Sequence, residues 1–312
     1  MNSVSDRQSR FKDSERELIE ALVSSEAFRR LQEVSFLGAI DYYNLHKSKD
    51  STWYFSRSDH VMGVLFLAQK LIEKIDFTEE DRLYVIASSI CHDLGHSPFS
   101  HSTERAFKKI NPNINHRVIL EFVLSAPEMG VAEALSRFNL SRNRVLAITV
   151  GTDNHLGWIF HNPINIDTLD GMLRFMASFR LQPPFDILEA INSLAVLNRA
   201  EALSEEEMYN LDKFWEVKAA FYDQFLKRGV YARFEDAYID LVISKKKNIG
   251  YRDYLKIDQE LADEIGLYPD LYDRKVQNKP AARESNFNID KSVPLASISD
   301  LHRRYLRKRG SA

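Results

Sequence analysis

The sequence of 312 residues contains a single cysteine, Cys91, which excludes a disulfide framework and a zinc site built from several thiolates. It has no long apolar run either, and nothing in it approaches the ~20 residues that a membrane-spanning helix needs. The polar residues 1–6 lack the apolar core of a signal peptide. We therefore expect a cytoplasmic protein that does not use a membrane.

The chain also has little net charge, because 42 Lys and Arg residues nearly balance 45 Asp and Glu residues and leave a formal net charge of −3. This excludes a global basic field for nucleic acid, so local cations must hold any anionic substrate. The exception is the end of the chain, where Arg and Lys recur in residues 302–309. Such an end could bind nucleic acid or a partner, but a solvated helix end is the plainer interpretation. The sequence also allows the protein to form a homo-oligomer.

Helical periodicity is nearly continuous from Ser14 onward, whereas strict alternation is short and rare. This predicts an all-α, multi-helix fold, divided into an N-terminal segment (1–13), one helical domain (14–268) and a polar, basic-ended tail (269–312). Asp59 is the expected cap of a helix that begins at His60. The main helices are expected at 60–75, 78–94, 101–109, 115–125, 128–137, 141–150, 166–180, 185–196, 204–227 and 232–245.

The densest group of ligand-type side chains lies in residues 91–101, which read Cys-His-Asp-Leu-Gly-His-Ser-Pro-Phe-Ser-His. Residues four apart share a helix face, so His92 and His96 are expected to converge, with Asp93 one step round. Gly95 would let the chain bend there. Imidazole and carboxylate together suit borderline or hard divalent ions, so the segment predicts part of a metal site.

Two adjacent residues cannot surround an ion, so further ligands must come from elsewhere in the sequence. His60 and Asp167 are the best candidates. Each has a plainer interpretation, His60 as a capping or core histidine and Asp167 as a helix cap. Asp170, in the same Asp-x-x-Asp-x-x-x-Arg frame, could simply pair with Arg174 four residues later.

The order of these motifs resembles the HD phosphohydrolase superfamily, and within it the deoxynucleotide triphosphohydrolase branch. The resemblance is strongest at residues 92–101 and covers about four fifths of the chain. It is carried by Phe28-Arg29-Arg30-Leu31-Gln32 with Leu37-Gly38, Arg57-Ser58-Asp59-His60, the 92–101 block, Asn115-His116, the Asp167 frame and, more faintly, Lys218-Ala219-Ala220-Phe221-Tyr222.

The resemblance implies an HD-domain fold in which four residues hold one divalent ion. These ligands would be His60, His92, Asp93 and Asp167. Such nitrogen and oxygen ligands fit Mn, Fe, Ni, Co or Mg, and the sequence does not name the ion. A second ion is left open, because His96, His116 and His155 are spare imidazoles.

Hydrolysis of a phosphate ester also needs a proton for the leaving oxygen. The resemblance implies that His101, Glu104 and His116 form the catalytic group. We expect His116 to transfer the proton, with Glu104 behind it to fix the tautomer of its ring. The plainer alternatives are a Glu104–Lys108 ion pair and a capping role for His116.

By the same resemblance, Arg57, His96 and Lys218 would bind the phosphate groups of the substrate. Lys218 stands where relatives carry an Arg, a change that keeps the charge but loses the fork geometry, and a solvated Lys is an equal alternative.

The substrate pocket is expected at Phe36, Leu37 and Phe175. Phe36 and Phe175 stand where well-known relatives carry a Gln and an acid that read the sugar 3′-hydroxyl. Thr168 and Gly171 likewise replace a Lys and a Tyr of the relatives. These changes retain the chemistry but alter substrate recognition.

Together these features predict a metal-dependent phosphohydrolase acting on a small phosphorylated substrate. A nucleotide or nucleotide-like phosphate is favoured, in the manner of a dNTP triphosphohydrolase. The alternative is a phosphomonoesterase or phosphodiesterase acting on another small ester. A more remote alternative is a non-catalytic module that binds a ligand or a partner.

Overall fold

The structure is a computed structural model that describes residues 11–47, 55–198, 203–221 and 229–267. Within these ranges it is all-helical, as predicted, and has no strand beyond an isolated bridge between Ser35 and Ser56. The helices are α2 Asp13–Val23, α3 Glu26–Leu31, α4 Ala39–Lys47, α5 Arg57–Ile72, α6 Glu79–Cys91, α7 Ser100–Ile110, α8 His116–Ser125, η1 Pro127–Met129, α9 Val131–Arg137, α10 Arg142–Thr149, α11 Trp158–His161, α12 Ile166–Ser178, α13 Ile187–Asn198, α14 Glu205–Phe221, α15 Gly229–Lys245, α16 Tyr251–Tyr254 and α17 Asp258–Ile265.

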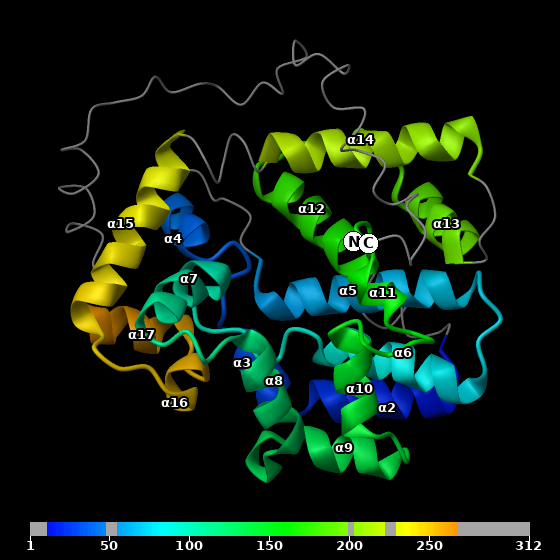
Figure 1. Cartoon of the computed structure of the whole chain (residues 1–312), viewed down its shortest axis with the longest axis horizontal. Coiled ribbons are helices and arrows are strands. Elements are labelled where there is room, and N and C mark those ends of the chain that lie inside the picture. The colour runs from blue at the N-terminus through cyan, green and yellow to red at the C-terminus, as the bar shows by residue number, and fades with distance from the viewer. Residues whose placement is uncertain (1–10, 48–54, 199–202, 222–228, 268–312) are drawn as a thin grey trace.

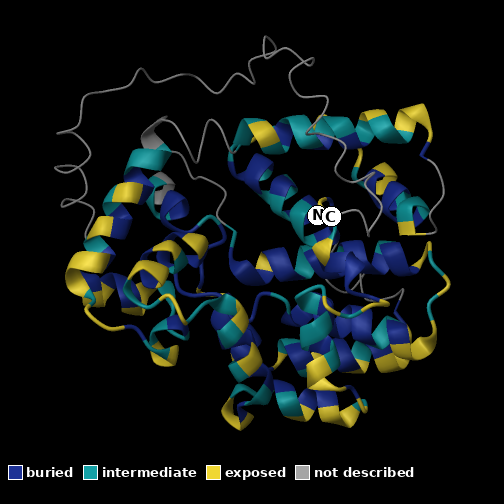
Figure 2. Cartoon of the chain, viewed as in Figure 1, coloured by how far each residue is buried: buried dark blue, intermediate teal, exposed yellow. Residues whose placement is uncertain are grey.

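Helix α5 lies at the centre of the molecule, between α6 on one side and α12 and α13 on the other (Figure 1). Its apolar residues form one buried stripe, and Figure 2 shows most of the helix buried. The buried positions of the stripe are Val61, Val64, Leu65, Leu67, Ala68, Leu71 and Ile72. Burying this stripe fixes the direction in which the first turn of α5 presents its polar side chains.

The cap of α5 differs from the prediction. The helix begins at Arg57, and Ser56 caps it by accepting a hydrogen bond from the Asp59 backbone N at 3.1 Å. Asp59 Oδ2 returns a bond by accepting from the Ser56 backbone N at 2.8 Å. Asp59 is therefore the third helical residue of a capping box and not the cap itself. His60 is the fourth residue of the helix and not the first.

Helix α6 ends at Cys91, earlier than predicted, and the chain continues in tight turns. Within them the backbone N of His96 donates to the carbonyl of Asp93 at 3.1 Å. The prediction that His92 and His96 share one helical face is therefore wrong. Gly95 explains the change, because a Cβ there would lie 2.1 Å from the His116 carbonyl oxygen. The turn is pressed against α8, and only a glycine fits.

The remaining helices pack around α5 and α6 or against one another (Figure 1). Helix α15 packs against α7 and α4, and α13 packs against α14 and α5, while α2 and α10 cover α6. The helix predicted at 204–227 corresponds to α14 up to Phe221, and residues 222–228 lie outside the described part.

Residues 1–10 and 268–312 are also outside the described ranges, and with them lies the basic end of the chain. The division into segments 1–13, 14–268 and 269–312 stays a prediction. Among the helices that are described, none is both long and apolar enough to cross a membrane.

Candidate active site

The site is built around His60, in the first turn of α5, whose side chain is 1% exposed. Its Nδ1 lies 2.7 Å from Asp170 Oδ2 and its Nε2 lies 3.1 Å from Asp167 Oδ1, both on α12. Gly63 makes this approach of α12 feasible, because a Cβ there would lie 1.8 Å from Asp170 Oδ1. With Nδ1 donating to Asp170, Nε2 is the nitrogen available to an ion.

His92 and Asp93 follow the end of α6 and face the same point. His92 Nδ1 donates to the Ser89 carbonyl oxygen at 2.9 Å, which directs Nε2 to within 3.4 Å of His60 Nε2. Asp93 Oδ2 lies 3.5 Å from His60 Nε2, and Asp93 Oδ1 lies 3.5 Å from His92 Nε2. The donor atoms of His60, His92 and Asp93 thus lie within 4.8 Å of one another. Asp167 adjoins this group through His60.

Electrostatics in this group favour a cation. Burial acts to lower the pKa of His60, but its hydrogen bonds to Asp167 and Asp170 outweigh burial and raise that pKa to about 9. Burial acts to raise the pKa of Asp93, yet His92, His96 and Arg57 hold it well below its usual range. The carboxylates are therefore ionised and hold positive charge beside them. Imidazole nitrogens, once a bound ion has displaced their protons, and ionised carboxylate oxygens together fit a borderline or hard divalent ion.

Arg57 lies next to the group, buried and hydrogen-bonded to protein through Nη1, Nε and Nη2. Its Nη1 donates to Asp93 Oδ2 at 2.8 Å, its Nε to Ser100 Oγ at 2.8 Å and its Nη2 to the Phe36 carbonyl oxygen at 3.2 Å. The predicted contact with phosphate would use the N–H groups that these bonds leave over. Its evident work in the structure is to position Asp93.

A second polar group lies beside the first, between α7 and α8. Glu104 Oε1 lies 2.6 Å from His116 Nδ1 and accepts from the His116 backbone N at 3.1 Å, while Oε2 lies 3.4 Å from His101 Nδ1. Burial acts to raise the pKa of Glu104, but these two imidazoles hold it well below its usual range. The expected arrangement of Glu104 behind His116 is present, and His116 is only partly buried, so its ring can reach a ligand.

His96 joins the two groups. Its Nε2 lies 3.1 Å from Asp93 Oδ1, and its ring stacks on that of His116 with centroids 5.0 Å apart. Burial, and then the charge of Arg57, lower the pKa of His96 to about 3, so the ring is neutral. His155 is elsewhere. It pairs with Asp81 at the start of α6, at 3.0 Å, and contributes nothing here.

Two adjoining cavities open at these residues. The smaller, about 160 Å³, is lined by His92, Asp93, His96 and His116, and the larger, about 600 Å³, extends away from them. Arg57, His101 and Asp167 line both. The smaller cavity has the size of a phosphate group with its surrounding water.

All the residues predicted for the substrate pocket line the larger cavity, namely Phe36, Leu37 and Phe175, and so does Lys218. Phe36 lies against the His60 ring with centroids 4.9 Å apart. The ammonium of Lys218 lies 5.0 Å from the centre of the Trp215 ring. Burial lowers the pKa of Lys218, and the nearby Asp167 partly opposes this. One end of the cavity is thus polar and cationic, and the wall is largely apolar.

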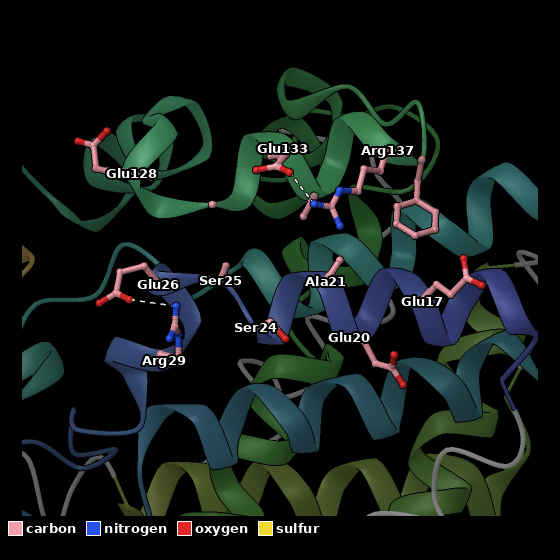
Figure 3. A pocket seen from close by; sticks show the side chains of 13 residues that line it. Glu17, Glu20, Ala21, Ser24, Ser25, Glu26, Arg29, Glu128, Glu133 and Arg137 are labelled. Carbon is pink, nitrogen blue, oxygen red and sulfur yellow. Dashed lines mark hydrogen bonds and ion pairs between the residues drawn. The ribbon is translucent and has the colours of Figure 1, made fainter.

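The chain also has a more voluminous groove, about 760 Å³, between α2, α3, η1 and α9 (Figure 3). Its polar lining is mostly Glu and Arg, including the pairs Glu26–Arg29 and Glu133–Arg137. No imidazole lines it, so we place the chemistry at the smaller cavities.

Sequence reasoning missed Asp170 as a partner of His60. Asp170 was expected only to pair with Arg174, a contact that is present at 2.7 Å. The signal was available, because residues three apart on a helix lie on one face and Asp167 was already a candidate. Ser89, whose carbonyl orients His92, carried no signal, since any residue supplies a carbonyl.

Comparison with known proteins agrees with this geometry. Residues 57–143 match the HD domain family. The matched residues include His60, His92 and Asp93, so this buried group lies within the part of the chain that is similar to an HD domain.

Particular relatives are more distant. An uncharacterized protein of Methanocaldococcus jannaschii, MJ1154, is 25% identical over 80% of this chain and 55% of its own length. The uncharacterized protein YwfO of Bacillus subtilis is 29% identical over 33% of this chain and 24% of its own. A Dictyostelium discoideum homolog of the deoxynucleoside triphosphate triphosphohydrolase SAMHD1 is 34% identical over 26% of this chain and 16% of its own. The chain thus spans little more than half the length of these curated relatives, or less.

Proposed function

We propose that this protein is a metal-dependent phosphohydrolase that acts on a nucleotide or a nucleotide-like phosphate. The observation that carries the proposal is the convergence of His60, His92 and Asp93 beside a phosphate-sized cavity. The ion would be held by these three residues and Asp167. When bound, it would supply a water of lowered pKa and neutralise charge on the phosphoryl group.

The protein's own residues account for the remaining chemistry. Glu104 holds the His116 ring through Nδ1, so Nε2 is the atom that gives a proton to the leaving oxygen. Asp170 and the Ser89 carbonyl fix the tautomers of His60 and His92. Arg57 keeps Asp93 ionised and in position. His96, His101 and Lys218 offer donors to phosphate oxygens at the junction of the two cavities.

The larger cavity would take the part of the substrate that is not phosphate. Its volume of about 600 Å³ is within the range of pockets for small organic ligands. The nucleotide assignment rests on the partial likeness to the SAMHD1 homolog, whose name describes a deoxynucleoside triphosphate triphosphohydrolase. Divalent Mn, Fe, Ni, Co and Mg are all candidates for the ion.

A second candidate is a phosphomonoesterase or phosphodiesterase acting on a different small ester. The observation that favours it is the apolar wall at Phe36 and Phe175, which offers no hydrogen bond to a sugar hydroxyl. It requires the same ion and the same His116, so the two candidates differ only in what the larger cavity binds.

One experiment separates them. The metal-free protein is incubated with each divalent ion and a panel of nucleoside triphosphates, monophosphates and non-nucleotide phosphate esters, and the products are resolved by chromatography. Release of inorganic triphosphate supports the first candidate, and release of orthophosphate from simple esters supports the second. No turnover with any ion or substrate would contradict both.

A further inference from the structure

The start of α7 has a backbone conformation that needs support. Phe99 and Ser100 have φ angles of 51° and 50°, in the left-handed region that favours glycine. Residues of other types persist in this region only where the surrounding contacts hold them. His101 is the next residue, so the direction in which its imidazole points depends on this turn.

Asp258, the first residue of α17, supplies part of that support. Its Oδ1 accepts a hydrogen bond from the Phe99 backbone N at 2.6 Å, and its Oδ2 accepts one from the Ser35 backbone N at 2.9 Å. Ser100 is tied to the same place, because its Oγ donates to the Ser35 carbonyl oxygen and accepts from Arg57 Nε at 2.8 Å. One carboxylate of α17 therefore joins the start of α7 to the surroundings of Arg57.

Arg30, on α3, is buried and holds the residues before this turn. Its Nη2 donates to the carbonyl oxygens of Leu94 at 3.0 Å and His96 at 2.7 Å. Its Nη1 donates to the carbonyl oxygens of Tyr254 at 3.3 Å and Lys256 at 3.2 Å, on the connection from α16 to α17. A guanidinium is planar and rigid, so its two terminal nitrogens fix these two backbone segments relative to each other.

Neither Arg30 nor Asp258 is among the residues that line the two cavities. Both also lie outside residues 57–143, the part of the chain that matches the HD domain family. The contacts described above all go to backbone atoms of the segment that carries His96 and His101. An effect of either residue on turnover would therefore have to pass through that backbone.

From these observations we propose that Arg30 and Asp258 are positioning residues, which hold residues 94–100 in the geometry that hydrolysis needs. The helices α16 and α17 then belong to the catalytic unit, although they contribute none of the residues that line the two cavities. This inference deepens the proposed function, on which its catalytic meaning rests.

The first test is amide hydrogen exchange of the full chain, followed by mass spectrometry, which needs no substrate. Asp258→Ala and Arg30→Ala remove the contacts. Asp258→Asn leaves one acceptor for two N–H groups, and Arg30→Lys leaves one donor nitrogen for four carbonyls, so these milder variants carry the test if an alanine variant does not fold. We expect faster exchange at residues 94–101 in each folded variant and unchanged exchange in α5.

Turnover is the second test. A displacement of about 1 Å at reacting groups can cost ~10²-fold in rate, so we expect kcat to fall by that order in the alanine variants and by less in the milder ones. Bound metal should stay the same, because the Ser89 carbonyl oxygen holds His92 and Arg57 holds Asp93. A residue that only stabilised the fold would lower the urea midpoint and leave the kcat of the folded protein unchanged.

Each residue has a matched control on its own helix. Arg29→Ala removes an exposed arginine of α3 that pairs with Glu26, and Asp263→Ala removes an exposed aspartate of α17 that pairs with Gln259. Both controls should behave as the unaltered chain. Unchanged exchange at residues 94–101, exchange that rises equally in α5, or an unchanged kcat in the folded variants would overturn the positioning role. If the unaltered chain hydrolyses no substrate, the proposed function fails, and the exchange measurement still decides whether these residues hold the turn.

Discussion

The proposed proton donor, His116, is held by Glu104. Its role can therefore be tested separately from metal binding. His116→Ala removes the proposed proton donor but none of His60, His92 or Asp93. We expect kcat to fall by ~10²–10⁴-fold, the usual worth of general acid or base catalysis, while bound metal stays the same. Steady-state kinetics and metal analysis on the same sample measure both. Loss of metal in step with activity would make His116 a ligand instead.

Phe36 and Phe175 lead to a prediction about the substrate. Both are buried in the wall of the larger cavity, and an aromatic face cannot pair with a sugar hydroxyl. A site that hydrogen-bonds a hydroxyl rejects the analogue without it strongly, whereas an apolar wall discriminates by only ~1–3 kcal/mol. We therefore expect 2′,3′-dideoxynucleotides to be hydrolysed about as well as deoxynucleotides, or better.

The comparison is of kcat/KM for the matched pair of substrates. A preference of a hundredfold or more for the 3′-hydroxyl would mean that another residue reads the sugar. Phe36 would then serve only to pack against His60 and Arg57, as it does at 4.9 and 5.0 Å.

At the scale of single residues, the sequence indicated which residues belong to the site better than it indicated what surrounds each of them. His60 was a weak candidate alone, and its role depends on Asp167 and Asp170, which are distant in sequence and close only through the packing of α12 on α5. Arg57 was expected at phosphate, but burial commits most of its donors to Asp93, Ser100 and Phe36. Such commitments depend on tertiary contacts that no local pattern records.

Among the elements, we expect the turn after α6 to be the most sensitive, because it carries the proposed metal ligands and rests on α8. Gly95→Ala would place a Cβ 2.1 Å from the His116 carbonyl oxygen and 2.6 Å from the Leu120 backbone N. Overpacking of this kind costs ~1–3 kcal/mol, and here it would also push His116 away from the site. We expect lower stability to urea and a lower kcat.

Gly250→Ala is the matched control, because a Cβ there meets nothing within 4 Å. It should unfold at the same urea concentration as the unaltered chain and keep its activity. If Gly95→Ala were equally harmless, the close packing of the turn on α8 would be wrong.

This turn also shows why element boundaries are harder to predict than elements. Residues 83–91 continue a helical pattern, and the types of residue at His92, Asp93 and Leu94 do not predict that the helix ends there. The turn that follows the helix is packed on α8, where a Cβ at Gly95 would lie 2.1 Å from the His116 carbonyl oxygen. Helix caps were easier to predict. Ser56 and Asp59 form a capping box, and their spacing could have placed the start of α5 one turn earlier.

For the whole molecule, Asp41 links stability to pH. Its side chain is buried in α4, and burial raises its pKa from 3.8 to about 7, although the Leu37 backbone N and Arg57 oppose the shift. Between pH 4 and 7 the unfolded chain releases this proton and the folded chain keeps it. The contribution of Asp41 to stability is thus full below about pH 4 and is lost as pH rises through about 7.

Asp41→Asn keeps an oxygen that can accept from the Leu37 N, at 2.6 Å in the structure, and cannot ionise. We expect it to be close to the unaltered chain at pH 4 and more stable at pH 8, by at most ~4 kcal/mol. Urea unfolding at the two pH values measures this. An identical difference at both values would show that Asp41 titrates normally.

The fold class of the whole molecule followed from periodicity alone, because a helix with one buried stripe, such as α5, records its environment every three or four residues. The arrangement of the site did not, since it depends on which helices meet. The resemblance of the His60, His92-Asp93 and Asp167 motifs to a known superfamily supplied that information, whereas the apolar wall at Phe36 and Phe175 departs from it and leaves the substrate to experiment.

The central claim is that hydrolysis depends on an ion held by His60, His92, Asp93 and Asp167. The most direct measurement is turnover of the best substrate by metal-free protein to which Mn²⁺ or Co²⁺ is returned in stoichiometric steps, with the double variant His92→Ala, Asp93→Ala treated in parallel. We expect activity to return in proportion to bound ion in the unaltered chain, and the folded double variant to recover neither tight binding nor turnover. Unchanged turnover in the double variant, or in the metal-free protein, would contradict the account.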